Sequence, residues 1–242
     1  MLNDTLIVIP SRLKSTRLQD KPLAKIHGYP MIYWVAKRIK NANICDYVVA
    51  TDSPKIEAVC NEYDINVIMT SLECRNGSER VAEVSEKLNY KYYCNVQGDE
   101  PLIDVNGVKD FIYSAKKYEN TFVQAVTLVK KSENDISEVK VAMDERNRIR
   151  YLSRLAIPFF RESITAEKHK CLGLYLYDKS FVSSYKNLDE GYLEKIESIE
   201  QLRCIENNLE IRAVIVSFDS ISVDTTDDLN YIKSFDLDKF ES

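Results

Sequence analysis

The chain has 242 residues, of which 45% are hydrophobic and 29% are charged, as in an ordinary globular protein. It is long enough for one large α/β domain, and no apolar run in it approaches the length that spans a bilayer. The formal net charge of −5 argues against a nucleic-acid-binding protein, which normally has a basic surface.

The N-terminus and the cysteines indicate the compartment. The chain enters an apolar segment at Leu6 without the basic region and hydrophobic stretch of a signal peptide. Its six cysteines include no C-x-x-C pair, which argues against a zinc site or a disulfide framework and for reduced thiols. We therefore expect a cytoplasmic protein without membrane insertion.

A cationic loop follows the first apolar segment. Leu6–Ile9 has the pattern of a strand buried on both faces of a parallel sheet, and Pro10 is expected to end it. The loop after it carries the cationic side chains Arg12, Lys14, Arg17 and Lys21, with Ser11, Ser15 and Thr16 as small hydroxyl donors between them. Its position is where α/β sheets bind ligands, and its charge suits a polyphosphate. From charge alone, a solvated surface loop explains the pattern equally well.

The loop is not a glycine-rich phosphate-binding motif. It contains no glycine, so neither G-x-G-x-x-G nor G-x-x-x-x-G-K-[ST] is present. Phosphate would have to be held by side-chain cations, with help from backbone N–H groups. Each cationic side chain would therefore contribute more to phosphate binding than it does in a glycine-rich loop.

Periodicity predicts alternating strands and helices through the first half of the chain. Apolar residues at positions 31, 32, 35 and 39 form a helical stripe. The short apolar runs 47–50, 66–69 and 92–96 are typical of buried strands, with helices expected after residues 53 and 76. This order favours an α/β fold with a doubly wound, mainly parallel, Rossmann-like sheet.

Two turns in this half have residue types that suit ligand binding. At the first, Gly77 lets a ligand approach the backbone, and Ser78 offers a hydroxyl and a helix-terminal N–H. At the second, Gln97-Gly98-Asp99 follows a strand and places a carboxylate at the sheet edge, where Mg²⁺ can share it with substrate phosphates. Taken alone, the first is also a simple helix cap and the second a common turn.

The second half of the chain lacks the regular alternation of strands and helices. A helix at 108–117 and a strand at 122–129 precede a polar segment and a hairpin at 139–154 with its turn at 144–147. Residues 171–177 alternate like a strand, and 192–203 has the pattern of an acidic helix with a solvated face. After a strand at 211–216, Thr225 or Thr226 can cap a last helix, which leaves Asp224 explicable as a turn residue.

Several separated motifs together resemble those of the CMP-3-deoxy-D-manno-octulosonate (CMP-Kdo) synthetases, in the sugar-nucleotidyltransferase superfamily. The motifs are Pro-x-Arg-x-x-x-Thr-Arg-Leu-x-x-Lys-Pro-Leu, Asn-Gly-Ser-Glu-Arg, Asn-Val-Gln-Gly-Asp-Glu-Pro-Leu, Tyr-Leu-Ser-Arg, Gly-x-Tyr, Glu-Gln-Leu-Arg and Val-Asp-Thr. The resemblance runs from about Leu6 to Leu229. It departs from the family at Cys171, where the family has histidine, and a thiol is a weaker donor without positive charge.

The resemblance implies a nucleotidyltransferase of type A fold that transfers CMP from CTP to the anomeric hydroxyl of a 3-deoxy-ulosonic acid, releasing pyrophosphate. It implies that Asp99 and Asp224 bind Mg²⁺. The catalytic residues it implies are Arg12, Lys21, Asp99 and Asp224. The nucleotide contacts it implies are Ser11, Arg12, Arg17, Lys21, Ser78 and Gln97. The sugar-acid contacts it implies are Arg80, Gln97, Arg154, Tyr175, Glu200 and Gln201. By sequence alone, Arg154 fits a surface salt bridge equally well.

The resemblance also implies a domain organisation. We expect one nucleotidyltransferase domain over residues 1–242, with a nucleotide-binding core at 1–129 and 205–242. A smaller α+β lobe at 130–204 would bind the sugar acid and form a homodimer. Neither the division nor the dimer follows from the periodicity.

Two alternatives stay open. Because of Cys171, the acceptor could be another acid, such as 8-amino-Kdo, a nonulosonate or a phosphonate. A non-catalytic nucleotide-binding module is the second alternative, and the presence of Lys21, Asp99 and Asp224 argues against it.

Overall fold

The computed structural model describes residues 2–13, 17–130, 133–161 and 167–241. The strands of its main sheet are β1 (Thr5–Ser11), β4 (Asp46–Thr51), β5 (Val67–Met69), β6 (Tyr92–Val96), β7 (Phe122–Leu128), β8 (Lys140–Met143), β9 (Ile149–Ser153), β10 (His169–Asp178) and β11 (Ile211–Ile215). A small hairpin consists of β2 (Lys25–Ile26) and β3 (Tyr29–Pro30). The helices are η1 (Lys21–Leu23), α1 (Met31–Ala42), α2 (Pro54–Glu62), α3 (Gly77–Lys87), α4 (Val105–Ala115), α5 (Lys179–Lys186), α6 (Tyr192–Glu197), α7 (Leu202–Glu206), α8 (Thr226–Lys233) and α9 (Asp238–Glu241).

The main sheet is mainly parallel, as predicted. Its strand order is β11-β7-β10-β6-β1-β4-β5, and off this path β8 pairs with β10 while β9 pairs with β8. β1 pairs in parallel with β4 and β6, and β11 pairs in parallel with β7. β10 runs antiparallel to both of its neighbours, β6 and β7.

The first strand is longer than predicted. Pro10 does not end β1, because Pro10 and Ser11 continue the parallel register with Ala50 and Thr51 of β4. The pairing with β6 stops at Val8, so the missing N–H of Pro10 falls where the strand has only one neighbour. The longer strand carries Ser11 to the carboxyl edge of the sheet.

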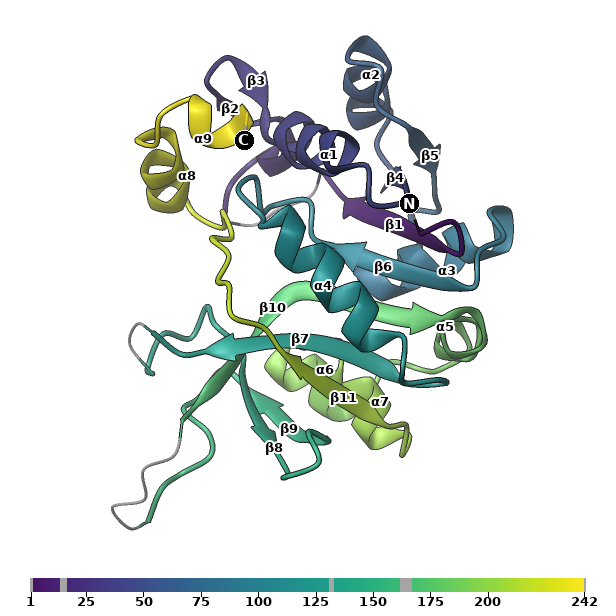
Figure 1. Cartoon of the computed structure of the whole chain (residues 1–242), viewed down its shortest axis with the longest axis vertical. Helices are drawn as coiled ribbons and strands as arrows, with labels where there is room; N and C mark the ends of the chain where they lie inside the picture. Colours follow the sequence, from purple (N-terminus) through teal and green to yellow (C-terminus); the bar gives the residue numbers. More distant parts are fainter. Residues whose placement is uncertain (1, 14–16, 131–132, 162–166, 242) are drawn as a thin grey trace.

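Helices cover both faces of the sheet, as a doubly wound fold requires (Figure 1). Ile7 and Ile9 of β1 belong to a core cluster with residues of α1, α2 and α4. Leu6 and Val8 belong to a second cluster with residues of α3, α5 and α7. Successive side chains of a strand point to opposite faces, so an uninterrupted apolar run satisfies both layers.

The segment 130–204 continues the main sheet. Its strand β10 lies between β6 and β7, and the β8–β9 hairpin turns at Asp144 as predicted. The strands of this segment therefore pair with strands of residues 1–129, and the division into two lobes stays a prediction.

The predicted single acidic helix at 192–203 is wrong. Ser198 takes a left-handed conformation with φ of 54°, which ends α6 and starts a turn before α7. The glutamates do not form a solvated face either, because Glu194 is buried and its two oxygens accept hydrogen bonds from Arg203 at 2.6 and 2.7 Å. The break turns Glu200 and Gln201 towards the sheet.

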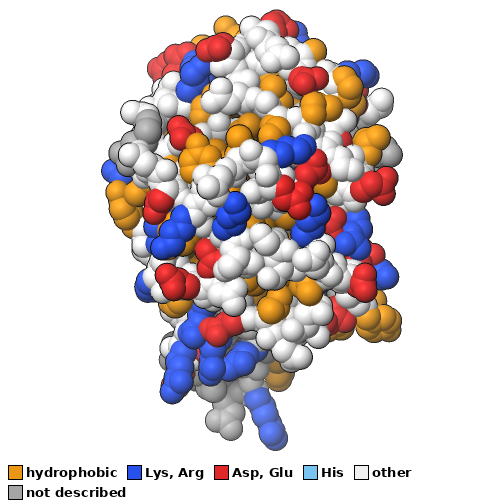
Figure 2. All heavy atoms as spheres, turned by 90° about the vertical axis from the view of Figure 1, so that its right-hand side faces the viewer, with side chains coloured by type: hydrophobic (Ala, Val, Ile, Leu, Met, Phe, Trp, Pro, Cys, Tyr) orange, Lys and Arg blue, Asp and Glu red, His pale blue; other side chains and the backbone are white. Residues whose placement is uncertain are grey.

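In the described part of the chain, no helix has the length and apolar character needed to cross a membrane. On the face that Figure 2 presents, acidic and basic side chains are intermixed, and Lys and Arg gather towards its lower end. That face therefore has no broad basic surface of the kind that binds nucleic acid.

Candidate active site

Two adjoining cavities open at the carboxyl ends of β1 and β6, with volumes of about 700 and 680 Å³. The residues that line both are Pro10, Ser11, Arg12, Gln97, Asp99 and Asp224. The larger cavity extends along β10 and the turn between α6 and α7, whereas the smaller one is bounded by Arg17 and Lys21. Ligands of α/β sheets bind at this edge.

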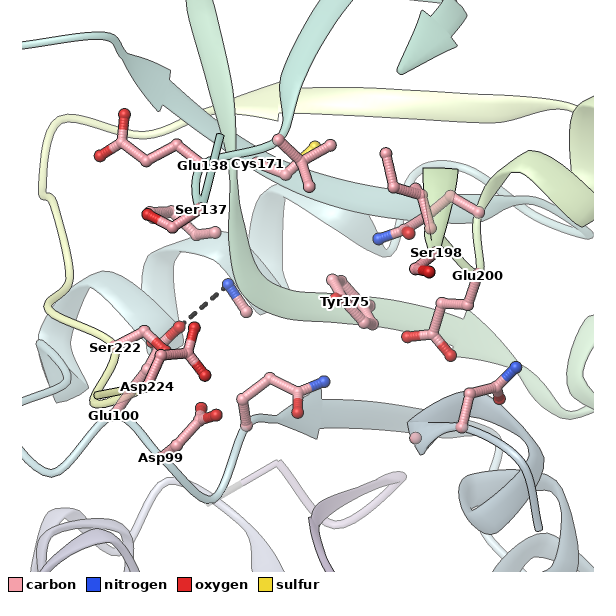
Figure 3. A pocket seen from close by; sticks show the side chains of 18 of the residues that line it. Asp99, Glu100, Ser137, Glu138, Cys171, Tyr175, Ser198, Glu200, Ser222 and Asp224 are labelled. Carbon is pink, nitrogen blue, oxygen red and sulfur yellow. Dashed lines mark hydrogen bonds between the residues drawn. The ribbon is translucent and has the colours of Figure 1, made fainter. Parts of the chain in front are cut away.

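Two distant carboxylates converge where the cavities meet. The Lys21 ammonium donates to Asp99 Oδ2 at 2.5 Å and to Asp224 Oδ1 at 2.9 Å. Arg17 Nη2 lies 3.0 Å from the same Asp224 oxygen. Figure 3 shows Asp99 and Asp224 close together at one end of the larger cavity. The cationic loop and both predicted metal ligands therefore form one cluster.

The charges in this cluster stabilise one another. Burial opposes the charge on Lys21, but Asp99 and Asp224 raise the pKa of its ammonium above the usual value. Burial likewise opposes ionisation of Asp224, but Lys21, Arg17 and the more distant Arg154 lower the pKa of that carboxyl. Lys21 and Asp224 are thus both charged at neutral pH.

The local structure explains how Asp224 reaches this place. Val223 N–H donates to the Asp99 carbonyl at 2.9 Å, which ties the two carboxylate-bearing segments together. Thr225 caps α8, and Asp228 accepts hydrogen bonds from the backbone N–H groups of Asp224 and Thr225. Since Thr225 serves as the cap, the Asp224 side chain is left to face Lys21.

The residues predicted to contact a nucleotide are placed unequally. Ser11 Oγ is buried without a hydrogen-bond partner among the described residues, and Arg12 Nη1 donates to the Arg75 carbonyl at 3.4 Å. Ser78 lines neither cavity, because its hydroxyl bonds Tyr177 at 2.7 Å behind the wall. Asn76 and Gly77, the residues just before it, line the larger cavity instead.

In the larger cavity, β10 and the turn before α7 bring together Tyr175, Glu200 and Gln201. Tyr175 is nearly buried in the wall between the two carboxylates and Glu200 (Figure 3). Gln201 Nε2 donates to Gln124 Oε1 at 2.8 Å, which fixes the amide inside the wall. Cys171 also lines this cavity, and burial raises the pKa of its thiol, so it is a neutral group there.

Glu200 has a distinctive environment. Its carboxylate accepts the backbone N–H of Ser78 at 3.1 Å, at the N-terminus of α3. The carboxyl lies deep enough in the wall for burial, assisted by the nearby charge of Glu194, to raise its pKa to about 7. Glu200 therefore exchanges its proton near neutral pH and can both donate and accept hydrogen bonds.

The two predicted arginines of the sugar-acid site differ. Arg80 lines the larger cavity, but its guanidinium is buried and bonded to Thr70 and, at 3.0 Å, to Asp52. Arg154 donates to backbone carbonyls of Ile136, Glu197 and Ser198, and forms no ion pair with a described carboxylate. Arg154 thus has an uncompensated charge beside the cavity.

Sequence reasoning missed Glu100 and Lys170, which line the same cavity. Glu100 is buried and accepts Gly173 N–H at 3.0 Å and the Ser220 hydroxyl at 2.7 Å, and burial raises its pKa to about 7. It links the Asp99 loop to β10 and to the segment before Asp224. The sequence signal that could have identified Glu100 is its position directly after Asp99 in the Gly-Asp-Glu-Pro stretch.

Lys170 lies between two carboxylates of the same wall. Its ammonium is 2.6 Å from Glu138 and 3.0 Å from Asp219, and the side chain is nearly buried. Burial opposes its charge, but the two carboxylates raise the pKa of Lys170. Its position next to Cys171 was the only signal in the sequence.

A buried ionic network supports the turn at the start of α3. Arg203 is fully buried and pairs with Glu194 at 2.6 Å and with Glu79 at 2.7 Å. Arg75 binds Glu79 as well, at 2.5 Å. The network joins the first turn of α3 to α6 and α7. Removing one partner would leave a buried charge uncompensated.

The residues at the cavity junction fit a hard divalent cation. Asp99 and Asp224 present carboxylate oxygens, which Mg²⁺ prefers, together with room for substrate phosphates in both cavities. No group of three His, Cys, Asp or Glu side chains able to hold a metal occurs among the described residues. A metal here would therefore complete its coordination with ligand oxygens and water.

A doubly wound sheet with paired carboxylates and clustered cations at its carboxyl edge is the architecture of an enzyme that acts on nucleotides. The chain belongs to the cytidylyltransferase family, whose model matches residues 6–211.

Named relatives of this family cover nearly the whole chain. The chain is 39% identical to the 3-deoxy-manno-octulosonate cytidylyltransferase of Fusobacterium nucleatum, over 93% of this chain and 96% of that protein. It is 37% identical to an 8-amino-3,8-dideoxy-manno-octulosonate cytidylyltransferase of Shewanella baltica, over 94% and 96%. The structure of a CMP:2-keto-3-deoxy-manno-octonic acid synthetase complexed with CTP superposes with a TM-score of 0.88 at 32% identity, covering 96% of this chain and 98% of that one.

Proposed function

We propose that this protein transfers CMP from CTP to the anomeric hydroxyl of a 3-deoxy-ulosonic acid, Kdo or a close relative, with release of pyrophosphate. The observation that carries the proposal is the convergence of Lys21, Asp99 and Asp224 at the junction of two cavities. The smaller cavity, bordered by Arg17 and Lys21, suits a nucleoside triphosphate, and the larger cavity suits a hydroxylated acid. Both substrates would then meet at the paired carboxylates.

The chain's own residues bind and orient the nucleotide. Arg12, Arg17 and Lys21 offer charge-assisted hydrogen bonds to the triphosphate. The buried Ser11 hydroxyl, which has no described partner, is available to the same ligand. Asp99 and Asp224 would hold Mg²⁺. When bound, that ion polarises the α-phosphate and neutralises developing charge.

The acceptor would occupy the larger cavity. Arg154 provides positive charge for the acid group, and Tyr175, Glu200 and Gln201 provide hydrogen-bonding groups for hydroxyls. The anomeric hydroxyl then attacks the α-phosphorus in line and gives up its proton to water, as a P–O bond forms and the bond to the leaving pyrophosphate breaks. Positioning and electrostatics supply the rate, so no covalent enzyme intermediate is needed.

Cys171 favours a second candidate acceptor. It lines the acceptor cavity as a neutral thiol. A cavity without an imidazole there lacks a hydrogen-bond donor that can carry positive charge. The lack of this donor weakens acceptor binding least if the acceptor has a different substituent from Kdo at the group that the imidazole would contact. One of the relatives is named for an 8-amino acceptor, so 8-amino-Kdo is the second candidate.

A homodimer and a cytoplasmic location complete the proposal. Leu155 and Phe159 are 69% and 85% exposed, in the segment that would form the dimer. Exposed apolar side chains of this size suit an interface between two copies. Light scattering on the purified protein should give twice the chain mass, and a monomer mass would contradict the dimer. Cell fractionation tests the location.

The transfer reaction is tested by pyrophosphate release with CTP, Mg²⁺ and a panel of acids. We expect release with Kdo or 8-amino-Kdo and a product whose mass is that of the CMP adduct. Release only with a nonulosonate or a phosphonate would overturn the acceptor assignment. Tight binding of CTP with no release for any acid would instead indicate a binding module. An Asp99→Asn variant is the control for contaminating activity.

A further inference from the structure

Lys21 occupies the position between the two carboxylates that a divalent cation would need. Its ammonium is 2.5 Å from Asp99 Oδ2 and 2.9 Å from Asp224 Oδ1. We propose that Lys21 competes with the divalent cation for these oxygens, so that the cation binds well only when the nucleotide phosphates draw Lys21 away. The inference rests on the proposed function, since it assigns the order in which that function's ligands assemble.

Geometry makes the two cations exclusive at these oxygens. Mg²⁺ needs carboxylate oxygens at about 2.0–2.1 Å, which places it inside the space that the ammonium fills. Two like charges in contact in a partly dry site repel strongly. A metal that bridges Asp99 and Asp224 through the same oxygens therefore requires the lysine to leave.

The surroundings make that departure costly unless another anion is present. The Lys21 side chain is only 15% exposed. If its ammonium left the two carboxylates without finding another anion, it would be a largely buried charge with no partner, which is costly. Arg17, in contrast, is 53% exposed, and it shares Asp224 Oδ1 with Lys21. Both cations border the smaller cavity, where a triphosphate would give them alternative oxygens.

Thermodynamic linkage then gives a measurable consequence. If the nucleotide relieves the competition, nucleotide and metal each raise the affinity for the other by the same factor. Such coupling is typically about 5- to 150-fold. Removing the Lys21 charge should give much of the same increase in metal affinity without nucleotide, because the carboxylates of the protein alone are then open to the metal.

The experiment measures binding of Mn²⁺ alone to the full chain, by the loss of the free-ion electron paramagnetic resonance signal. Lys21→Met should bind Mn²⁺ at least about tenfold more tightly than the wild type. Lys21→Arg, which retains the charge, should stay close to the wild type. Lys25→Met, which removes an exposed lysine nearby, is the matched control and should also leave the affinity unchanged.

A second substitution locates the metal. Adding Asp99→Asn to Lys21→Met should abolish the gain, because one of the two carboxylate ligands is lost. A gain that persists would place the metal elsewhere and overturn the proposal. An affinity of Lys21→Met equal to or below that of the wild type would overturn it too, since the metal would then be using oxygens that Lys21 does not block.

The proposal stays testable if Lys21→Met does not fold. Arg17→Gln removes one of the two cations on Asp224 Oδ1 from an exposed position, and should raise Mn²⁺ affinity several-fold. An unchanged affinity in this variant would contradict the competition. The measurement involves neither CTP nor the acceptor, so a failure of the proposed transfer reaction would appear separately, in the pyrophosphate assay.

Discussion

Replacing Glu200 by glutamine should make the protein more stable at neutral pH while impairing its reaction. Glutamine has the shape of protonated glutamic acid and keeps an oxygen to accept the Ser78 N–H. It does not ionise. The variant therefore removes the cost of holding a carboxylate in the cavity wall, and it also removes the group proposed to contact the acceptor.

The magnitude follows from the pKa. Burial raises the pKa of Glu200 from 4.5 to about 7, a difference that corresponds to about 3 kcal/mol. Below the lower value both folded and unfolded chains are protonated, so the group costs nothing. As the pH rises from the lower value to the upper one, the unfolded chain ionises before the folded chain does, so the wild type loses stability over this interval and little more above it. The advantage of Glu200→Gln should grow from about 1 kcal/mol near pH 5 to about 3 kcal/mol near pH 8.

Urea unfolding at several pH values measures this advantage. Trp34 is fully buried, so its fluorescence reports unfolding. Glu145→Gln, in the exposed turn of the β8–β9 hairpin, controls for the loss of one carboxylate from the chain. An advantage of Glu200→Gln that does not change between pH 5 and pH 8 would refute the argument, because it would mean that burial does not hold the proton on Glu200.

Three further substitutions test the site. Asp224→Asn should lower transfer by about 10²-fold or more, measured by pyrophosphate release. Arg154→Lys keeps the charge but loses the planar fork, so KM for the acceptor should rise about tenfold while KM for CTP stays unchanged. Gly173→Ala would place a methyl group 2.6 Å from Gln97 Cγ and against Glu100, and should cost about 1–3 kcal/mol in urea unfolding.

The sequence predicted those features whose signal is local. Continuous apolar runs predicted β1, β4 and β6, because parallel strands that are buried on both faces are apolar at nearly every position. The placement of Asp99 was also predictable, since it follows one of these strands directly. Asp224 needed the family resemblance, because its own segment is equally well explained as the start of a helix.

Features that depend on distant contacts could not be predicted. The break between α6 and α7 occurs at Ser198, with no glycine or proline to announce it. Glu200 faces the cavity because its carboxylate bonds the N–H of Ser78, far away in the chain. Glu194 belongs to a predicted solvated stripe, yet it is buried because Arg203 pairs with it. In each case a partner remote in sequence overrides the local pattern.

The distribution of charge explains how an acidic chain can receive two anionic ligands. Lys21 and Lys170 are each held by two carboxylates. Arg12 and Arg154 line the larger cavity and form no ion pair with a described carboxylate. Glu200, in the same wall, has a pKa of about 7, so it can be neutral when an acid binds. Within the larger cavity, the positive charge of Arg12 and Arg154 is therefore available where phosphate and carboxylate groups would lie, although the net charge of the chain is −5.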